Sequence, residues 1–328
     1  MKNIYLILGV FTMLFSACET DFDVNAEWEE TTVVFGLLDA SDENQLQKIK
    51  ISKAFLGNMD AYQMAQYSDS INYGVDELDV KIYKWDFNQI EDSVELIAVP
   101  TYRDGEIFYD SIIVYQFDNV NLFLQKGYEY ELVVKNNKSG NVVQSTSKVV
   151  GEFSFGGMDD ELKFYKPFNP DSTKFTFEKI TWDNAKNAAI YQLTVRINYT
   201  EGGETLHLDW IHPIEDKENL TLLLGRKFFS FLVANSQPGK QLEVTNSSLV
   251  RRFQSIDLFL TAGTADLDTY IKVNEPITGI VQERPQYSNI NNGIGLFSSR
   301  YSLVKKDELE LSDGTKDYVR DNLNLNFQ

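Results

Sequence analysis

The chain has 328 residues, of which 43% are hydrophobic and 13% aromatic, and its formal net charge at pH 7 is −19. This apolar content is enough for a packed core and excludes a disordered chain. The negative charge argues against nucleic acids and anionic lipid surfaces as partners, because both bind proteins through basic residues. It favours solubility, basic partners or divalent cations.

A short apolar run near the start of the chain ends at its only cysteine. The segment 4–16 is largely apolar, and Ser16 and Ala17 supply small side chains directly before Cys18. A run of this length is too short to span a bilayer and is typical of a signal peptide. The pattern resembles a bacterial lipobox, which implies acylation of the thiol and a mature chain that begins at Cys18. We therefore expect a lipoprotein signal peptide over 1–17; a free, buried cysteine is the alternative.

Acidic residues follow this cysteine within the segment 18–28, which we expect to be a tether. They are Glu19, Asp21 and Asp23, interleaved with uncharged residues. The arrangement resembles the export signal of surface-displayed lipoproteins of the Bacteroidota. Because two or more acyl chains hold a protein durably on a membrane, we expect a lipid-anchored outer-membrane protein that faces the cell surface. An anchor that faces the periplasm, with a solvated acidic linker, is the alternative.

Seven short runs of β-branched and aromatic residues follow in the first half of the chain. Turn dipeptides such as Asp104-Gly105 and Lys126-Gly127 separate them. Strands at this spacing predict an antiparallel β-sandwich of the immunoglobulin class over residues 29–155. The runs are 31–38, 46–56, 78–85, 93–100, 105–117, 128–136 and 141–150.

The segment 57–74 interrupts these strands, and some of its apolar residues have helical spacing. Structured loops on a rigid sandwich often carry binding residues. We therefore select candidate residues for contact with a partner, namely Met59, Tyr62, Met64 and Tyr67. A plug over the open end of the sandwich is the alternative interpretation.

The second half contains a tryptophan that precedes a long alternating strand. Trp182 is followed by Ala189, Tyr191 and an alternation of apolar and polar residues. This order resembles the first third of a fibronectin type III domain, and the resemblance implies that Trp182 lies in the core. We expect a boundary at 153–173 and this domain over 156–270. Later strands are expected at 206–214, 219–225, 240–248 and 255–263, followed by a short helix after Ala265.

The last part, 271–328, is expected to be an extension with a glycine-containing strand and a terminal helix that begins after Ser312. In the segment YSNINNGIGLFSSR, glycines permit positive φ angles or a close approach of two backbones. Its residues Tyr287, Asn289 and Asn291 are further candidates for contact with a partner. The fold expected for the chain is all-β, with two antiparallel sandwiches and a few short helices.

Three features together resemble an uncharacterised family of Bacteroidota outer-membrane lipoproteins. They are the lipobox with its acidic tail, the early VVFGLLD and QKIKISKAFLG stretches, and the late YSNINNGIGLFSSR motif. The resemblance implies an immunoglobulin-like N-terminal half and genes that lie beside those of TonB-dependent transporters. It implies no activity.

Residues suited to catalysis or metal binding are few. The only histidines, His207 and His212, would point to opposite faces of a strand, whereas zinc needs three or four N or S ligands. The sequence contains neither a G-x-S-x-G nucleophile elbow nor a glycine-rich phosphate loop. We predict no catalytic residues and no metal site; Ca²⁺ is the alternative use of Asp159, Asp160 and Glu161, whose oxygens suit it without forming an EF-hand pattern.

These features favour a non-enzymatic, lipid-anchored binding subunit. The resemblance implies an outer-membrane transporter or another outer-membrane complex as its partner. A glycan-binding or adhesin module is the second hypothesis, and a hydrolase ranks last. Glycan binding needs exposed aromatic side chains, and the candidates are Tyr62, Tyr67, Tyr73, Trp85 and Trp210.

Overall fold

The structure is a computed structural model that describes residues 31–41, 46–54, 71–102, 111–119, 123–168, 174–212, 215–216, 219–246, 248–276 and 285–328. Residues 31–328 form one compact unit. Strands make up 53% of the structure, which contains three helices within these ranges, so the β-rich class is confirmed. Each of the seven runs predicted in the first half overlaps a strand, but the run 93–100 overlaps two separate strands, Gln89–Glu95 and Ile97–Tyr102.

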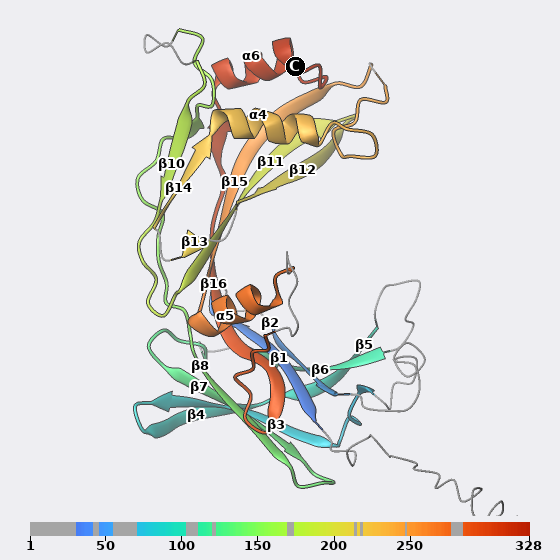
Figure 1. Ribbon diagram of the computed structural model, residues 1–328, viewed down its shortest axis with the longest axis vertical. Coiled ribbons are helices and arrows are strands. Elements are labelled where there is room, and N and C mark those ends of the chain that lie inside the picture. The colour runs from blue at the N-terminus through green and yellow to red at the C-terminus, as the bar shows by residue number, and fades with distance from the viewer. Residues whose placement is uncertain are drawn as a thin grey trace, which may run out of the picture. The chain divides into compact units, whose positions relative to one another are not determined.

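A mixed sheet of ten strands includes segments from both halves of the chain (Figure 1). Its strands are β1 (Thr32–Asp39), β2 (Leu46–Lys53), β5 (Ile97–Tyr102), β6 (Ser111–Asp118), β9 (Glu161–Leu162), β11 (Ile190–Glu201), β12 (Glu204–Ile211), β13 (Glu215–Asp216), β15 (Arg251–Gly263) and β16 (Gly293–Leu311). Their order is β12-β11-β15-β16-β1-β2-β6-β5, with β13 paired to β11 and β9 paired to β16.

Two smaller antiparallel sheets and three helices complete the described part. The four-stranded sheet has the order β4-β3-β7-β8, and a ribbon is formed by β10 and β14. The strands are β3 (Leu78–Asp86), β4 (Gln89–Glu95), β7 (Glu129–Asn136), β8 (Val142–Lys148), β10 (Phe177–Thr181) and β14 (Leu220–Leu224). The helices are α4 (Gly225–Ala234), α5 (Ala265–Asn274) and α6 (Asp313–Asn322).

The first core lies between the β1-β2-β6 part of the large sheet and the four-stranded sheet. Val34 and Ile51 from one layer, and Ile82 and Leu132 from the other, are almost completely buried. Buried residues alternate with less buried ones along β3 and β7, so each strand has one dry and one wetter face. The first half therefore forms two packed β layers.

The second core differs from the first because helices help to close it. β11, β12, β15 and β16 supply one wall, and α4, α6 and the β10-β14 ribbon pack against them (Figure 1). Trp182 is 3% exposed and packs on Tyr191 with ring centroids 5.3 Å apart, which confirms its predicted place in a core. Leu162 and Phe164, from the expected boundary segment, also belong to this core.

The glycines of the GIG sequence permit a close approach of β16 to β1. A Cβ added at Gly295 would lie 2.0 Å from the carbonyl oxygen of Val34, and one at Gly293 would lie 2.8 Å from that of Thr32. Gly295 also has φ +120°, which strongly favours glycine. The expected close backbone approach is therefore confirmed.

β16 has two partners in succession. Its residues 293–300 pair with β1 in parallel, and the part from Arg300 to Leu309 pairs antiparallel with β15. Where the partner changes, Nε of Arg300 donates to Oδ2 of Asp39 at 2.8 Å. The expectation of purely antiparallel sheets is thus wrong at β16, which pairs in parallel with β1 and with β9.

Two further expectations about secondary structure are corrected. The segment 240–248 was expected to be a strand, but its described residues form turns and irregular structure. The guanidinium of Arg251 donates to the carbonyl oxygens of Leu242 and Glu243, which therefore need no neighbouring strand. Helix α4 was not expected, although Phe228, Phe229 and Leu232 have the spacing of one helical face.

Two of the expected helices are confirmed. α5 begins directly after Thr264, and α6 begins directly after Ser312. The carbonyl oxygen of Ser312 accepts hydrogen bonds from the amides of Thr315 and Lys316, as an N-terminal cap residue does.

No helix in the described ranges combines the length and the apolar character needed to cross a membrane.

Candidate functional site

Several residues predicted to be functional lie outside the described residues. The lipid anchor, the export signal and the first candidate loop therefore remain predictions. These residues are Cys18, Glu19, Asp21, Asp23, Met59, Tyr62, Met64 and Tyr67.

The second candidate loop, which contains Tyr287, Asn289 and Asn291, lies within the described residues. Hydrogen bonds hold it against the sheets. Asn289 donates through Nδ2 to the carbonyl oxygen of Phe297 at 2.7 Å and accepts from its amide at 2.9 Å. Asn291 exchanges main-chain hydrogen bonds with Gln144 of β8. The hydroxyl of Tyr287 donates to the carboxylate of Asp266 in α5. Burial and the nearby Asp266 carboxylate together raise the pKa of Tyr287 to about 12. These contacts position the loop. That the loop contacts a partner remains a prediction.

The acidic residues considered for Ca²⁺ do not form a ligand cluster. Asp159 pairs with Lys163 at 2.8 Å, and this ammonium group lowers the pKa of the Asp159 carboxyl. Asp160 and Glu161 are exposed, and Glu161 lies in β9. Within the described ranges, no three His, Cys, Asp or Glu side chains come close enough together to hold a metal ion. The calcium alternative therefore gains no support.

The two histidines lie on opposite faces of the same segment, as predicted. His207 is exposed, whereas His212 is 7% exposed and its ring lies 4.3 Å from that of Trp210. Burial, together with the nearby Lys227 ammonium, lowers the pKa of His212 to about 4. Nε2 of His212 has no hydrogen-bond partner among the described residues. His212 is therefore a neutral residue of the core.

Two aromatic residues considered for glycan binding are also core residues. Tyr73 is 1% exposed and shares a hydrogen bond with Thr32, and Trp210 is 7% exposed. Neither ring is exposed enough to stack on a sugar, so the prediction that they could bind glycans is wrong. Trp85 is partly exposed and donates through Nε1 to Glu131 at 3.0 Å.

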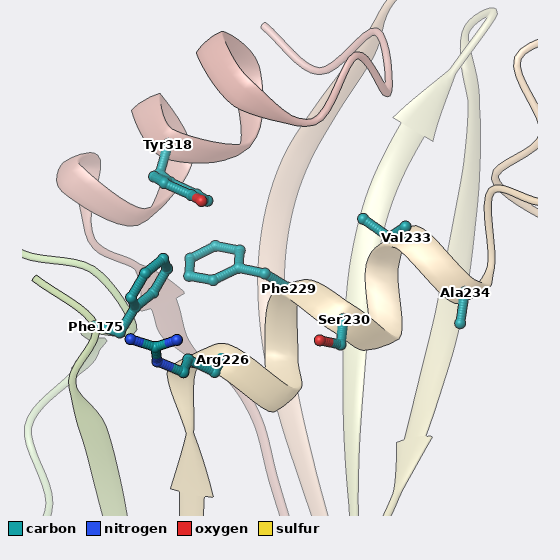
Figure 2. A pocket seen from close by; sticks show the side chains of 7 residues that line it. All are labelled: Phe175, Arg226, Phe229, Ser230, Val233, Ala234 and Tyr318. Atoms are coloured by element: carbon teal, nitrogen blue, oxygen red, sulfur yellow. The ribbon is translucent and has the colours of Figure 1, made fainter.

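A pocket of about 520 Å³ lies between α4 and α6 (Figure 2). Most of its lining comes from one stripe of α4, because residues four and seven positions apart share a helix face. Phe175, which precedes β10, and Tyr318 of α6 complete the walls. The lining residues are Phe175, Arg226, Phe229, Ser230, Val233, Ala234 and Tyr318.

Three aromatic rings form one side of this pocket. Phe175 meets Phe229 and Tyr318 edge to face, with centroids 5.7 and 5.4 Å apart. The rings of Phe229 and Tyr318 are 4.5 Å apart and tilted by 48°. Tyr165 contacts both Phe175 and Tyr318 from behind. Edge-to-face contacts of this kind hold each ring in a defined orientation, so the wall is preformed.

A cation lies at the edge of the same wall. Cζ of Arg226 is 4.9 Å from the centroid of the Phe175 ring. Arg226 is exposed and forms no ion pair or hydrogen bond with another described side chain. Figure 2 shows the guanidinium beneath the Phe175 ring and the Ser230 hydroxyl on the same side of α4. The pocket thus combines apolar walls with a positive charge that no described carboxylate pairs with.

The other two pockets considered offer no free cation. One of about 550 Å³ near the C-terminus is lined in part by Arg320, but Asp317 and Asp321 already pair with its guanidinium. The other, of about 290 Å³, contains Lys148, which lies 4.0 Å from the carboxylate of Glu129. We therefore regard the pocket between α4 and α6 as the candidate site.

Comparison with known proteins adds no family. A scan against protein-family models finds no match for the chain, and a search of the curated proteins finds no relative. None of the pocket residues was predicted from the sequence. The available signal was the helical spacing of Arg226, Ser230 and Val233 in GRKFFSFLVA.

Proposed function

We propose that this chain is a lipid-anchored lipoprotein of the outer membrane, displayed on the cell surface, that acts as a non-enzymatic binding subunit. Its partner is an outer-membrane transporter or another outer-membrane complex. The observation that carries this proposal is the single cysteine, Cys18, directly after a short apolar leader and two small residues. The compact unit 31–328 then provides the binding surfaces.

The geometry of the described part supports binding rather than catalysis. Apolar walls with a few polar groups at the edge are the common composition of ligand pockets. The pocket between α4 and α6 has this composition, with Arg226 as its cation. The histidines of the chain do not line this pocket, and Nε2 of His212 has no hydrogen-bond partner among the described residues.

We further propose that the two-layer first half is an immunoglobulin-like sandwich. The packing of the β1-β2-β6 strands on β3, β7 and β8 supports this proposal. The contact of Trp182 with Tyr191 supports a fibronectin type III-like origin for the second half, to which α4 and α6 are additions.

The lipid anchor is tested by labelling cells that produce the full chain with an alkyne analogue of palmitate. The wild-type protein should carry the label and sediment with outer membranes, whereas Cys18→Ala should lose the label and appear in the soluble fraction. Immunoblots of total protein control for expression. An unlabelled wild-type protein in the soluble fraction would overturn the proposal.

Surface display and the partner are tested on the same cells. Protease added to intact cells should digest the wild-type protein and spare a variant in which Glu19, Asp21 and Asp23 are replaced by glutamine or asparagine. Cross-linking before detergent extraction should recover the wild-type protein with a large outer-membrane protein. Recovery of the cross-linked chain alone would contradict the proposed role as a subunit.

A further inference from the structure

The charge of Arg226 is the first observation that points to a ligand. On a chain with a net charge of −19, most arginines have acidic neighbours to pair with. Arg251, Arg300 and Arg320 each bind a carboxylate, but Arg226 has no such partner among the described residues. Its guanidinium lies against the Phe175 ring, and its hydrogen-bond donors bind no other described side chain. A planar guanidinium matches a planar carboxylate best, since the two form paired hydrogen bonds.

The hydroxyl groups of Ser230 and Tyr318 are the second observation. Thr269 of α5 donates to the carbonyl oxygen of Ala265, as helical hydroxyls commonly do. Ser230 of α4 makes no such bond, and the Tyr318 hydroxyl also has no hydrogen-bond partner among the described residues. Figure 2 shows both hydroxyl groups on the pocket side of their helices. One guanidinium and two neutral donors suit a monoanion better than a doubly charged phosphate group.

The apolar walls are the third observation. Phe175, Phe229 and Tyr318 present ring edges and faces, and Val233 remains 40% exposed although it is apolar. Covering such a surface removes apolar area from water, and an aromatic group would extend the edge-to-face contacts already present. The volume of about 520 Å³ lies within the range of sites for small ligands.

We propose that the pocket between α4 and α6 binds a carboxylate that is attached to an aromatic or bulky apolar group. This inference rests on the proposed role of the chain as a binding protein. The carboxylate pairs with Arg226 and accepts from Ser230, and the apolar group packs on Phe175, Phe229 and Val233. A free organic acid and the C-terminal residue of a polypeptide share this chemistry.

The test is calorimetric titration of the full chain, purified in detergent, with four probes. They are N-acetylphenylalanine, its amide, an acetylated tripeptide that ends in phenylalanine, and the amide of that tripeptide. Both acids should bind, and each amide should bind about 10- to 100-fold more weakly because it lacks the charge. Tighter binding of the tripeptide acid than of N-acetylphenylalanine identifies a polypeptide terminus as the source, and equal binding identifies a free acid.

Variants assign the binding to this pocket. Arg226→Gln should lower the affinity for both acids about 10- to 100-fold and leave the affinity for the amides unchanged. Lys227→Gln removes the same charge from the next residue, which does not line the pocket, and should leave all four probes unchanged. Ala234→Trp should block every probe by filling the pocket, and thermal unfolding checks that each variant is folded.

Equal binding of acid and amide, loss of affinity in Lys227→Gln equal to that in Arg226→Gln, or no binding of either acid would overturn the inference. Palmitate labelling of Cys18 in the same preparation separates this failure from failure of the proposed function. If the protein is labelled but binds no acid, only the proposed ligand is wrong. If the protein binds the acids but is not labelled, only the proposed lipid anchor is wrong.

Discussion

The buried imidazole of His212 links stability to pH. In the folded chain its pKa is about 4, against an ordinary value of 6.5, because burial disfavours the charged ring. Above pH 6.5 the ring is neutral in both folded and unfolded chains and has no effect. As the pH falls from 6.5 towards 4, this imidazole becomes protonated in the unfolded chain but stays neutral in the folded chain. Protonation therefore stabilises the unfolded state, and the folded chain loses stability.

We expect this loss to reach about 2–3 kcal/mol near pH 4 and then to level off. The measurement is the free energy of unfolding in urea between pH 4 and 7.5, compared between wild type and His212→Phe. The phenylalanine variant should show the smaller loss on acidification. His207→Gln, at the exposed histidine, is the matched control and should follow the wild type. Identical pH dependence in wild type and His212→Phe would contradict this account.

Arg251 is a second residue with a strong expected effect. It is 3% exposed, and its guanidinium donates to the carboxylate of Glu201 and to the carbonyl oxygens of Leu242, Glu243 and Leu325. Arg251→Met would leave these acceptors buried without a donor, so we expect a loss of about 3–5 kcal/mol in unfolding free energy.

The neighbouring Arg252 is exposed and provides the control for Arg251. Arg252→Met should change the unfolding free energy by less than about 0.5 kcal/mol. Both values come from urea titrations followed by circular dichroism. A similar small change in both variants would show that the network around Arg251 contributes little.

At the scale of elements, the pairing of β16 with β1 depends on glycine. Gly295→Ala would bring a Cβ to 2.0 Å from the carbonyl oxygen of Val34 at a φ of +120°. We expect a loss of at least about 2 kcal/mol in unfolding free energy. Gly157→Ala is the control, because no atom lies within 4 Å of a Cβ placed there. Equal stability of the two variants would mean that β1 and β16 separate at little cost.

The secondary-structure elements that could be predicted are those whose residue pattern is complete within a short segment of the sequence. The seven runs of the first half contain strands, since alternation with a period of two is visible in a few residues. Ser312 marked the start of α6 for the same reason. The pairing of β1 with β16 could not be predicted, because nothing near Val34 indicates a partner as distant as Gly295. The segment 240–248 resembled a strand, but the side chain of Arg251 binds its carbonyl groups.

The candidate site was missed for a related reason. Arg226 and Ser230 lie on one face of a helix, and this spacing was visible in the sequence. The aromatic wall needs Phe175 and Tyr318, which come from separate parts of the chain and meet only after folding. Long loops are the usual place for binding residues on a β-sandwich, whereas this pocket is lined mainly by a helix.

At the scale of the whole molecule, two predicted domains share one strand. β16 pairs with β1 at its start and with β15 further on, so unfolding of either core disturbs the same strand. We expect a single cooperative transition in urea for residues 31–328. Trp85 reports on the first half, and Trp182 and Trp210 belong to the second core. Variants that keep only one of these tryptophans should give coincident fluorescence transitions. Two separated midpoints would instead support independent domains.

The shared strand also sets the order of events during synthesis. Asp39 and Arg300, which meet where β16 changes partner, are 261 residues apart in the sequence. A ribosome therefore completes β1 long before the strand that covers its open edge exists, and such distant pairing is slow to form. A nascent or truncated chain that ends before Gly293 exposes this edge to proteases and to other chains. Full-length translation thereby becomes a condition for escape from degradation.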